Sequence, residues 1–271
     1  MTSQGRQLFL VTMGGFGVEA GARRLDTADF GRRKARALLA ALLCAGEPVH
    51  RERLLEWFWP SLAPRRGLAC LYTTLHALRR TLEPRLGPGG ASSHVLLEGE
   101  TYRLDLGPDG GWDGARILDA AETPADAVDP NGVASLERAE TLCRGSFLPE
   151  WPYEPWAEQR RGEVEQAAQA VIARLAEIEL ARGRPERAAA RYRRLLADDP
   201  EREAWHRGLM RAYAEAGEFG LALRQYAACR SHLRRVQGGL PSPQTTRLYA
   251  SLLRSELDRV GTALDPPLVA E

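Results

Sequence analysis

A set of residues that recurs every 34 positions constrains the fold of this 271-residue chain more than any other feature. The recurring pairs are Gly183 and Gly217, Ala188 and Ala222, Tyr192 and Tyr226, and Leu175 and Leu209. A period of this length is that of tetratricopeptide units, in which a small Ala lets two helices approach closely and a Tyr fills the space between units. The second half of the chain is therefore predicted to be an array of stacked helix pairs.

Further helices are expected around these repeats. Residues 113–123 and 133–143 are predicted to be short helices, and residues 156–182 one long helix with an apolar stripe of Val164, Ala168, Val171, Ile172, Leu175 and Ile178. Pro185 starts a helix, Asp199-Pro200 ends a unit, and the last helix runs from about 242 to 260 with Leu248, Leu252 and Leu253 inward. Between these helices, Trp151, Tyr153 and Trp156 are expected to pack on the long helix, and the chain end at 261–271 is expected to fray.

The first half mixes strands and helices. Residues 7–19 are β-like and interrupted by glycines, and a second short strand follows the turn at Gly21. Helices are predicted over residues 30–46, over 51–59 with Pro48-Val49-His50 as the start, and over 64–82. Residues 94–106 alternate around Glu98-Gly99-Glu100 and predict a hairpin. The expected core side chains are Ala35, Leu38, Leu39, Leu42, Leu43, Leu54, Leu55, Phe58 and Trp59.

The helix over residues 64–82 has two opposed faces. At about 100° per residue, its apolar stripe consists of Leu71, Leu75, Leu78 and Leu82. The opposite face carries Ala69, Thr73, His76 and Arg80, bordered by Arg65, Arg66 and Tyr72. A helix of this kind docks on a core by its leucines and offers guanidinium, hydroxyl and imidazole groups to a DNA major groove. The alternative interpretation is a solvated surface helix.

Strands, three helices and a final hairpin are typical of a winged helix-turn-helix, in which the third helix enters the major groove and the hairpin reaches the adjacent backbone or minor groove. The initial strands and the long third helix resemble the OmpR/PhoB type of winged helix. The resemblance rests on "RRKARALLAALL", on "RERLLEWFW" with its Trp59, on "LHALRRTL" and on "GETYRLDL".

This resemblance implies a DNA-binding set on the third helix and the wing, consisting of Arg65, Arg66, Tyr72, Thr73, His76, Arg79, Arg80 and Arg103. Arg32 and Arg33 are outlying candidates for phosphate contacts. The first turns of the helix depart from the pattern of that type, because Leu68, Ala69 and Cys70 offer few base-reading groups. We therefore expect backbone positioning to outweigh base readout, and a winged helix without sequence-specific binding remains an alternative.

Charge divides the chain in the same way. Residues 1–107 hold 15 Lys and Arg against 10 Asp and Glu, a net charge of +5, whereas residues 108–271 hold 22 against 26, a net charge of −4. A Gly/Asp-rich stretch at 108–114 is predicted to be a linker, which gives a DNA-binding domain at 1–107 and a helical domain at 108–271. The expected fold is mainly α with small β. The basic first half favours a polyanion partner, and the acidic second half favours protein contacts.

Several function classes are disfavoured. No apolar run approaches the roughly 18 residues of a membrane span, and the first residues lack a signal-peptide pattern, so a cytoplasmic protein is expected. The four cysteines form no CxxC pair; Cys44 and Cys70 are expected in the core, and neither a metal site nor a cofactor is expected. The histidines are scattered and the chain has no HExxH, GxSxG, GxxxxGK or strand-following GxGxxG, so an enzyme is not expected.

The second half resembles the bacterial transcriptional activator domain in "EPWAEQRRGEVE", in the segment from "GRPERAAARYRRLL" to "LRQYAACRSHL", and in "GGLPSPQTTRLYASLL". With the winged helix before it, the whole chain resembles the SARP family of regulators. This resemblance implies a cytoplasmic transcription factor that binds promoter repeats in double-stranded DNA and recruits RNA polymerase.

An interaction module is the alternative from another class. In that interpretation the helical repeats bind a protein or a small-molecule effector and the winged helix is degenerate. An anionic site would be lined by Arg187, Arg191, Arg194, Arg224 and Arg230, unless these are solvated faces. Homodimerisation, through the helical half or by side-by-side binding to DNA repeats, is left open.

Overall fold

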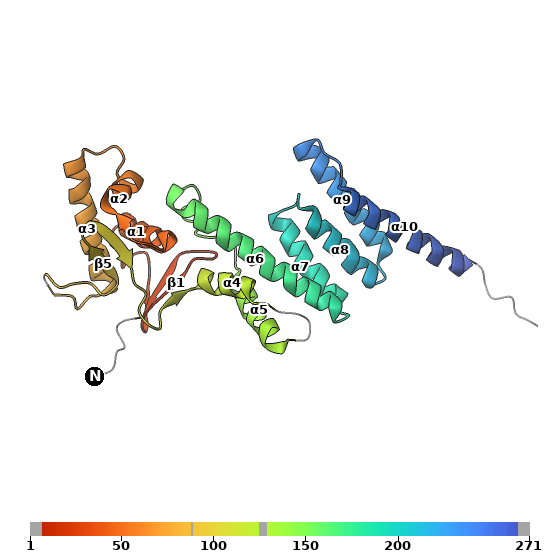
Figure 1. Cartoon of the computed structure of the whole chain (residues 1–271), viewed down its shortest axis with the longest axis horizontal. Helices are drawn as coiled ribbons and strands as arrows, with labels where there is room; N and C mark the ends of the chain where they lie inside the picture. The colour runs from red at the N-terminus through yellow and green to blue at the C-terminus, as the bar shows by residue number, and fades with distance from the viewer. Residues whose placement is uncertain (1–6, 88, 125–128, 265–271) are drawn as a thin grey trace, which may run out of the picture. The chain divides into compact units, whose positions relative to one another are not determined.

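The computed structural model describes residues 7–87, 89–124 and 129–264, and it is mainly helical with two small sheets (Figure 1). The predicted fold class is confirmed. Two compact units divide the chain: one comprises Met1–Asp119 and Thr141–Ala168, and the other comprises Ala120–Glu140 and Gln169–Glu271. The predicted boundary between residues 107 and 108 stays a prediction.

The first sheet has the strand order β3-β2-β1-β7. Its strands are β1 (Leu8–Val11), β2 (Gly17–Ala20), β3 (Arg23–Leu25) and β7 (Gly111–Trp112). The predicted strands at the start of the chain are confirmed, but β7 lies inside the predicted linker and pairs in parallel with β1. The prediction of a linker at residues 108–114 is therefore wrong in part. A strand of two residues is too short to show the alternation of apolar and polar side chains that indicates a strand.

The winged helix is present as predicted. Its helices are α1 (Arg33–Ala45), α2 (Arg51–Phe58) and α3 (Pro64–Leu82), and its sheet has the order β4-β6-β5, with β4 at Val49–His50, β5 at Val95–Glu98 and β6 at Thr101–Leu104. The predicted core of α1 is buried, and Gly46 ends the helix with a φ of 68°. The predicted helix start at Pro48–His50 was wrong in part, because Val49 and His50 pair with β6 before His50 caps α2.

Residues 141–168 belong to the same unit as the winged helix. Trp151 and Trp156 are buried with ring centroids 5.8 Å apart, as predicted, but Tyr153 is 94% exposed and that prediction was wrong. Tyr153 follows Pro152 in an exposed turn, which an aromatic composition alone does not reveal. Cys44 is buried as expected, whereas Cys70 is only partly buried.

The helical array follows. Its helices are α4 (Asp113–Glu122), α5 (Pro130–Leu142), α6 (Pro155–Ala181), α7 (Pro185–Asp198), α8 (Glu203–Glu215), α9 (Phe219–Gln237) and α10 (Pro243–Leu264). The repeat is confirmed: Gly183 and Gly217 have positive φ, and Ala188 and Ala222 are fully buried. Most of the predicted fraying end, residues 265–271, lies outside the described residues. None of the described helices has the length and apolar composition needed to cross a membrane.

Candidate nucleic-acid interface

Helix α3 is held by its leucine stripe and begins at Pro64, whose fixed φ suits the first helical position. Leu71, Leu75, Leu78 and Leu82 are 0–5% exposed, as predicted. Gly67 lies against α2: a Cβ there would meet Leu55 Cδ2 at 3.3 Å. A side chain at position 67 would therefore require Leu55 to shift by a few tenths of an ångström.

The opposite face of α3 is open. The exposed residues of this face are Arg65, Arg66, Ala69, Tyr72, Thr73, His76 and Arg80. Helix α3 contains no Asp or Glu, so no carboxylate of its own opposes a phosphate there. Six of the eight residues predicted for DNA binding are therefore brought together on one exposed, basic helix face.

Arg79 has a different environment from Arg80. Its Nε and Nη2 atoms donate to the Val95 carbonyl oxygen at 3.2 and 2.9 Å, which joins α3 to strand β5 of the wing. The Arg79 side chain is partly buried, and two of its donors are engaged within the fold. Arg79 therefore joins the helix to the wing, whereas Arg80 is exposed.

The threonine hydroxyls of α3 are engaged as donors. Thr73 Oγ1 donates to the Ala69 carbonyl at 2.8 Å, and the buried Thr74 Oγ1 donates to the Cys70 carbonyl at 2.7 Å. While this bond is kept, the Thr73 oxygen is free to accept a hydrogen bond but not to donate one. In this state the exposed Thr73 suits a donor on a base edge, such as the amino group of C or A.

The wing carries acids at its tip. Glu98 Oε1 lies 3.3 Å from Arg103 Nη2, and both side chains are well exposed. Glu100 forms an ion pair with Arg51, with Oε1 2.6 Å from Arg51 Nη2, and its Oε2 lies 3.1 Å from His50 Nε2 in a hydrogen bond. Arg103 is therefore already paired within the wing, and a phosphate would have to compete with Glu98 for its guanidinium.

A recess of about 440 Å³ separates α3 from the wing. It is lined by Tyr72, Leu75, His76, Arg79, Arg80, Leu86, Gly87, Gly89, Gly90, Leu97 and Tyr102. Burial, followed by the proximity of Tyr72, raises the pKa of Tyr102 above its ordinary value, so this phenol stays neutral near pH 7. The recess is thus lined by apolar side chains together with Arg79, Arg80 and His76.

Glu83, which caps the end of α3, ties the helix to the start of the wing. Its carboxylate accepts hydrogen bonds from Ser92 Oγ, from the Ser93 amide at 3.0 Å and from Ser93 Oγ at 2.7 Å. Partial burial by itself would raise the Glu83 pKa, but the bonds from Ser92 and Ser93 outweigh it, and the pKa lies below its ordinary value. The ionised carboxylate therefore fixes the α3–wing junction.

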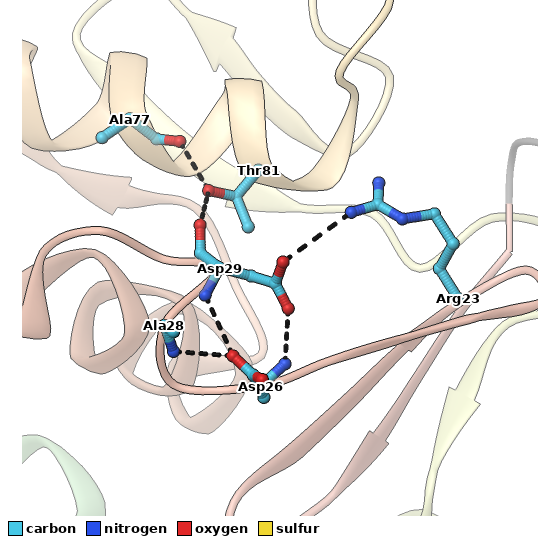
Figure 2. Close-up of polar contacts among 6 residues, drawn as sticks. All are labelled: Arg23, Asp26, Ala28, Asp29, Ala77 and Thr81. Atoms are coloured by element: carbon cyan, nitrogen blue, oxygen red, sulfur yellow. Dashed lines mark hydrogen bonds and ion pairs between the residues drawn. The ribbon is translucent and has the colours of Figure 1, made fainter.

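The other side of α3 is anchored to the turn between β3 and α1 (Figure 2). Thr81 Oγ1 lies 3.1 Å from the Asp29 carbonyl, and Asp26 Oδ1 accepts from the amides of Ala28 and Asp29 at 2.7 and 3.1 Å. Sequence reasoning missed this anchor. The available signal was the two acids in "DTAD", because Asp side chains that accept from amides two or three residues on are typical of tight turns.

Comparison with known proteins identifies the helical half. The family model of the bacterial transcriptional activator domain matches residues 114–253, which is more than half of the chain. The chain belongs to this family. Its winged helix followed by the activator domain is the organisation of a SARP-type transcriptional regulator, as the sequence predicted.

Relatives extend the similarity into the winged helix. The chain is 28% identical over 231 residues to the transcriptional regulatory protein MoaR1 of Mycobacterium tuberculosis, which covers 83% of this chain and 73% of MoaR1. It is 28% identical over 235 residues to the regulatory protein AfsR of Streptomyces coelicolor, which covers 85% of this chain and 23% of AfsR. These relatives are regulators, and so is this SARP-type chain.

A solved structure has the same fold. The structure of Mycobacterium tuberculosis EmbR in complex with a low affinity phosphopeptide superimposes with a TM-score of 0.74 and 23% sequence identity. The match covers 92% of this chain and 65% of that chain. At this identity the similarity supports the fold alone. Phosphopeptide binding is a property of EmbR.

Proposed function

We propose that this SARP-type regulator binds double-stranded DNA through α3, positions its wing on the neighbouring backbone and activates transcription by recruiting RNA polymerase. The observation that carries the proposal is the exposed face of α3, which combines Arg65, Arg66 and Arg80 with Tyr72, Thr73 and His76 and contains no acid. Arginines suit phosphates, and hydroxyl and imidazole groups suit base edges.

The structure supports stronger backbone contacts than base reading. The first turns of α3 expose Ala69 and the arginines at 65 and 66, and the Thr73 hydroxyl proton is engaged. The base-reading role therefore falls chiefly on His76, with Thr73 as an acceptor. A regulator of this kind binds its sites with a large phosphate component and modest discrimination between sequences.

Gel retardation of genomic fragments at two salt concentrations tests the proposal. We expect retardation at low salt that weakens steeply at high salt, because phosphate contacts release counterions. Arg80→Ala should weaken binding and lower the slope of log affinity against log salt by about 1. Absence of any retarded band at low salt would refute the proposal, and an unchanged slope would remove Arg80 from the contacts.

A second candidate function is favoured by a groove in the helical array. A hollow of about 520 Å³ is lined by Arg174, Arg207 and Arg211 together with Glu177, Tyr192, Trp205, Leu248, Ala173 and Ala204. Trp205 Nε1 is buried and finds no hydrogen-bond acceptor among the described residues. Arg211 pairs with Glu177, so Arg174 and Arg207 carry the net positive charge of the groove, which suits an anionic effector.

This effector function can be tested by fluorescence. Trp205 is the one tryptophan of its compact unit, because Trp57, Trp59, Trp112, Trp151 and Trp156 lie in the other. A variant with these five changed to Phe would report on the groove alone, provided that circular dichroism confirms folding. Titration with a carboxylate or phosphate compound library should change its emission, and Arg207→Gln should abolish the change.

We propose further that the chain acts by binding, without catalysis, and in the cytoplasm. Analytical sedimentation would measure whether it forms a dimer.

A further inference from the structure

Helix α9 has an unusual charge composition for its half of the molecule. Among the helices that the structure describes, only α1, α3 and α9 contain no Asp or Glu. The first two belong to the winged helix, whereas α9 lies in the helical array, the half of the chain with a net charge of −4. Like α3, α9 is 19 residues long and carries four arginines and one histidine.

The helical periodicity places the arginines of α9 on one side of the helix, whose course Figure 1 shows. With Arg224 as the zero position and about 100° per residue, Arg235, Arg234 and Arg230 lie at about +20°, −80° and −120°. All four are exposed, and between them lie only the small exposed residues Ala227 and Ser231. We call this surface the α9 arginine face.

Among the residues that the structure describes, no carboxylate pairs with this face. Within residues 7–87, 89–124 and 129–264, none of the four arginines forms an ion pair, and Arg235 alone has a partner, the His232 ring at 3.0 Å. A shallow hollow of about 400 Å³ runs along Arg230, Ser231, Arg234 and Arg235. Other arginines of the array are used internally, as Arg191 is with Glu140 at 2.8 Å and Arg211 with Glu177.

The chemistry of the face favours a nucleic-acid backbone over a protein. Protein–protein interfaces are depleted of charge at their centre and carry aromatic or aliphatic anchors. The described residues between the arginines offer only a methyl group and a hydroxyl. Protein–DNA contacts are more positive and more polar, and phosphate contacts need no anchor. A smooth, unpaired cationic surface therefore fits a phosphate chain.

We propose that the α9 arginine face is a second DNA-backbone contact, made to phosphates without base reading and separate from the contacts of α3. The inference rests on the proposed DNA-binding function and assigns part of the phosphate component to the helical half. It predicts that the chain has more phosphate contacts than the winged helix alone supplies.

Fluorescence anisotropy with a labelled duplex of mixed sequence, over a series of salt concentrations, tests this proposal. The full chain is compared with R224Q/R230Q/R234Q, in which Gln preserves helix propensity. The control R193Q/R247Q/R254Q removes the same charge from exposed arginines of α7 and α10 that have no ion pair among the described residues. Circular dichroism checks that each variant is folded.

We expect the α9 variant to lose about tenfold or more in affinity at low salt and its salt slope to fall by about 2 to 3, with the control near wild type. A wild-type slope in the α9 variant, or an equal loss in the control, overturns the proposal. An α3 variant, R65Q/R66Q/R80Q, separates the two ideas: if it binds normally while the α9 variant does not, the α3 function fails and the α9 contact stands. Binding of the wild-type chain and of the α9 variant to polyglutamate is measured as well. If the α9 variant loses polyglutamate binding while its DNA salt slope is unchanged, the face binds an acidic protein and the proposal is overturned. If the wild-type chain binds no duplex, both proposals fail.

Discussion

At the residue scale, two neighbouring arginines of α3 have different tasks. Arg79 donates twice to the Val95 carbonyl and is partly buried, whereas Arg80 is exposed on the proposed DNA face. The sequence placed Arg79 and Arg80 in one basic cluster, because helical periodicity gives the direction of a side chain only roughly. Only the packing of the wing against α3 determines that Arg79, and not Arg80, donates to a backbone carbonyl. This tertiary contact cannot be predicted from local spacing.

This contrast gives a paired prediction. Arg79→Gln should lower the free energy of unfolding by about 1–2 kcal/mol, because a charge-assisted bond to the Val95 carbonyl is lost. Arg80→Gln should leave unfolding within about 0.5 kcal/mol of wild type and weaken DNA binding. Urea unfolding and anisotropy on both variants check the pair. A destabilised Arg80→Gln with a stable Arg79→Gln would reverse the assignment.

Glu98 provides a prediction of the opposite sign. Its carboxylate occupies Arg103 at 3.3 Å on the exposed wing. Glu98→Gln should raise DNA affinity about two- to fivefold at low salt, because one negative charge is removed and Arg103 becomes available to a phosphate. Stability should hardly change, since exposed ion pairs contribute about 0–1 kcal/mol. Glu56→Gln on α2, which breaks an exposed pair with Arg53, is the charge-matched control. An equal gain in DNA affinity in this control would mean that the release of Arg103 contributes nothing specific.

At the scale of elements, Glu83 makes the α3–wing junction dependent on pH. Its pKa in the fold lies below its ordinary value, so its contribution to stability is present above the unfolded pKa of about 4.3 and is lost as pH falls through the folded pKa. Glu83→Gln should be about 1 kcal/mol less stable than wild type at pH 7, a figure reduced for partial exposure. The difference should shrink below about pH 4. Urea titrations across this range measure it, and a gap that stays constant with pH would rule out the ionised carboxylate as its source.

The packing of the repeats gives another prediction at this scale. A Cβ at Gly208 of α8 would lie 2.3 Å from the buried Tyr192 ring, whereas a Cβ at Gly220 of α9 would have its nearest atom, Arg224 Nη1, at 3.9 Å. Gly208→Ala should destabilise by about 1–3 kcal/mol through overpacking, and Gly220→Ala should be neutral or stabilise by up to about 1 kcal/mol. Thermal unfolding distinguishes them. Equal melting temperatures would mean that Tyr192 moves aside without cost.

At the scale of the whole molecule, the sequence predicted what depends on periodicity. The leucine stripe of α3, the long α6 stripe and the 34-residue repeat specify buried faces directly, and all three are found. What it missed depends on contacts between distant segments. Strand β7 exists because β1 is beside it, and the buried Asp113 accepts from Thr12, 101 residues earlier. Neither residue type nor local spacing contains that information.

Asp113 leads to a test of where the winged-helix half ends. Its carboxylate accepts from the Thr12 amide and hydroxyl at 2.8 and 2.6 Å and from the Met13 amide at 3.0 Å. Nearby, the Gly14 amide bonds to the Ser146 carbonyl and the Leu148 amide to the Thr12 carbonyl. A fragment that stops at residue 107 loses all of these partners, together with strand β7.

We therefore expect the fragment 1–107 to melt at a lower temperature than the same residues within the full chain and to exchange its β1 amides faster. Each buried amide left without an acceptor costs about 1–3 kcal/mol. In the full chain, Asp113→Ala should reproduce the β1 exchange while leaving α3 protected, because its contacts are confined to the first sheet and its turn. Hydrogen exchange read residue by residue measures both. If the fragment matches the full chain in melting and exchange, residues 1–107 are an autonomous domain and the Asp113 hydrogen bonds are dispensable. If it does not, the winged helix depends for its stability on residues that follow position 107.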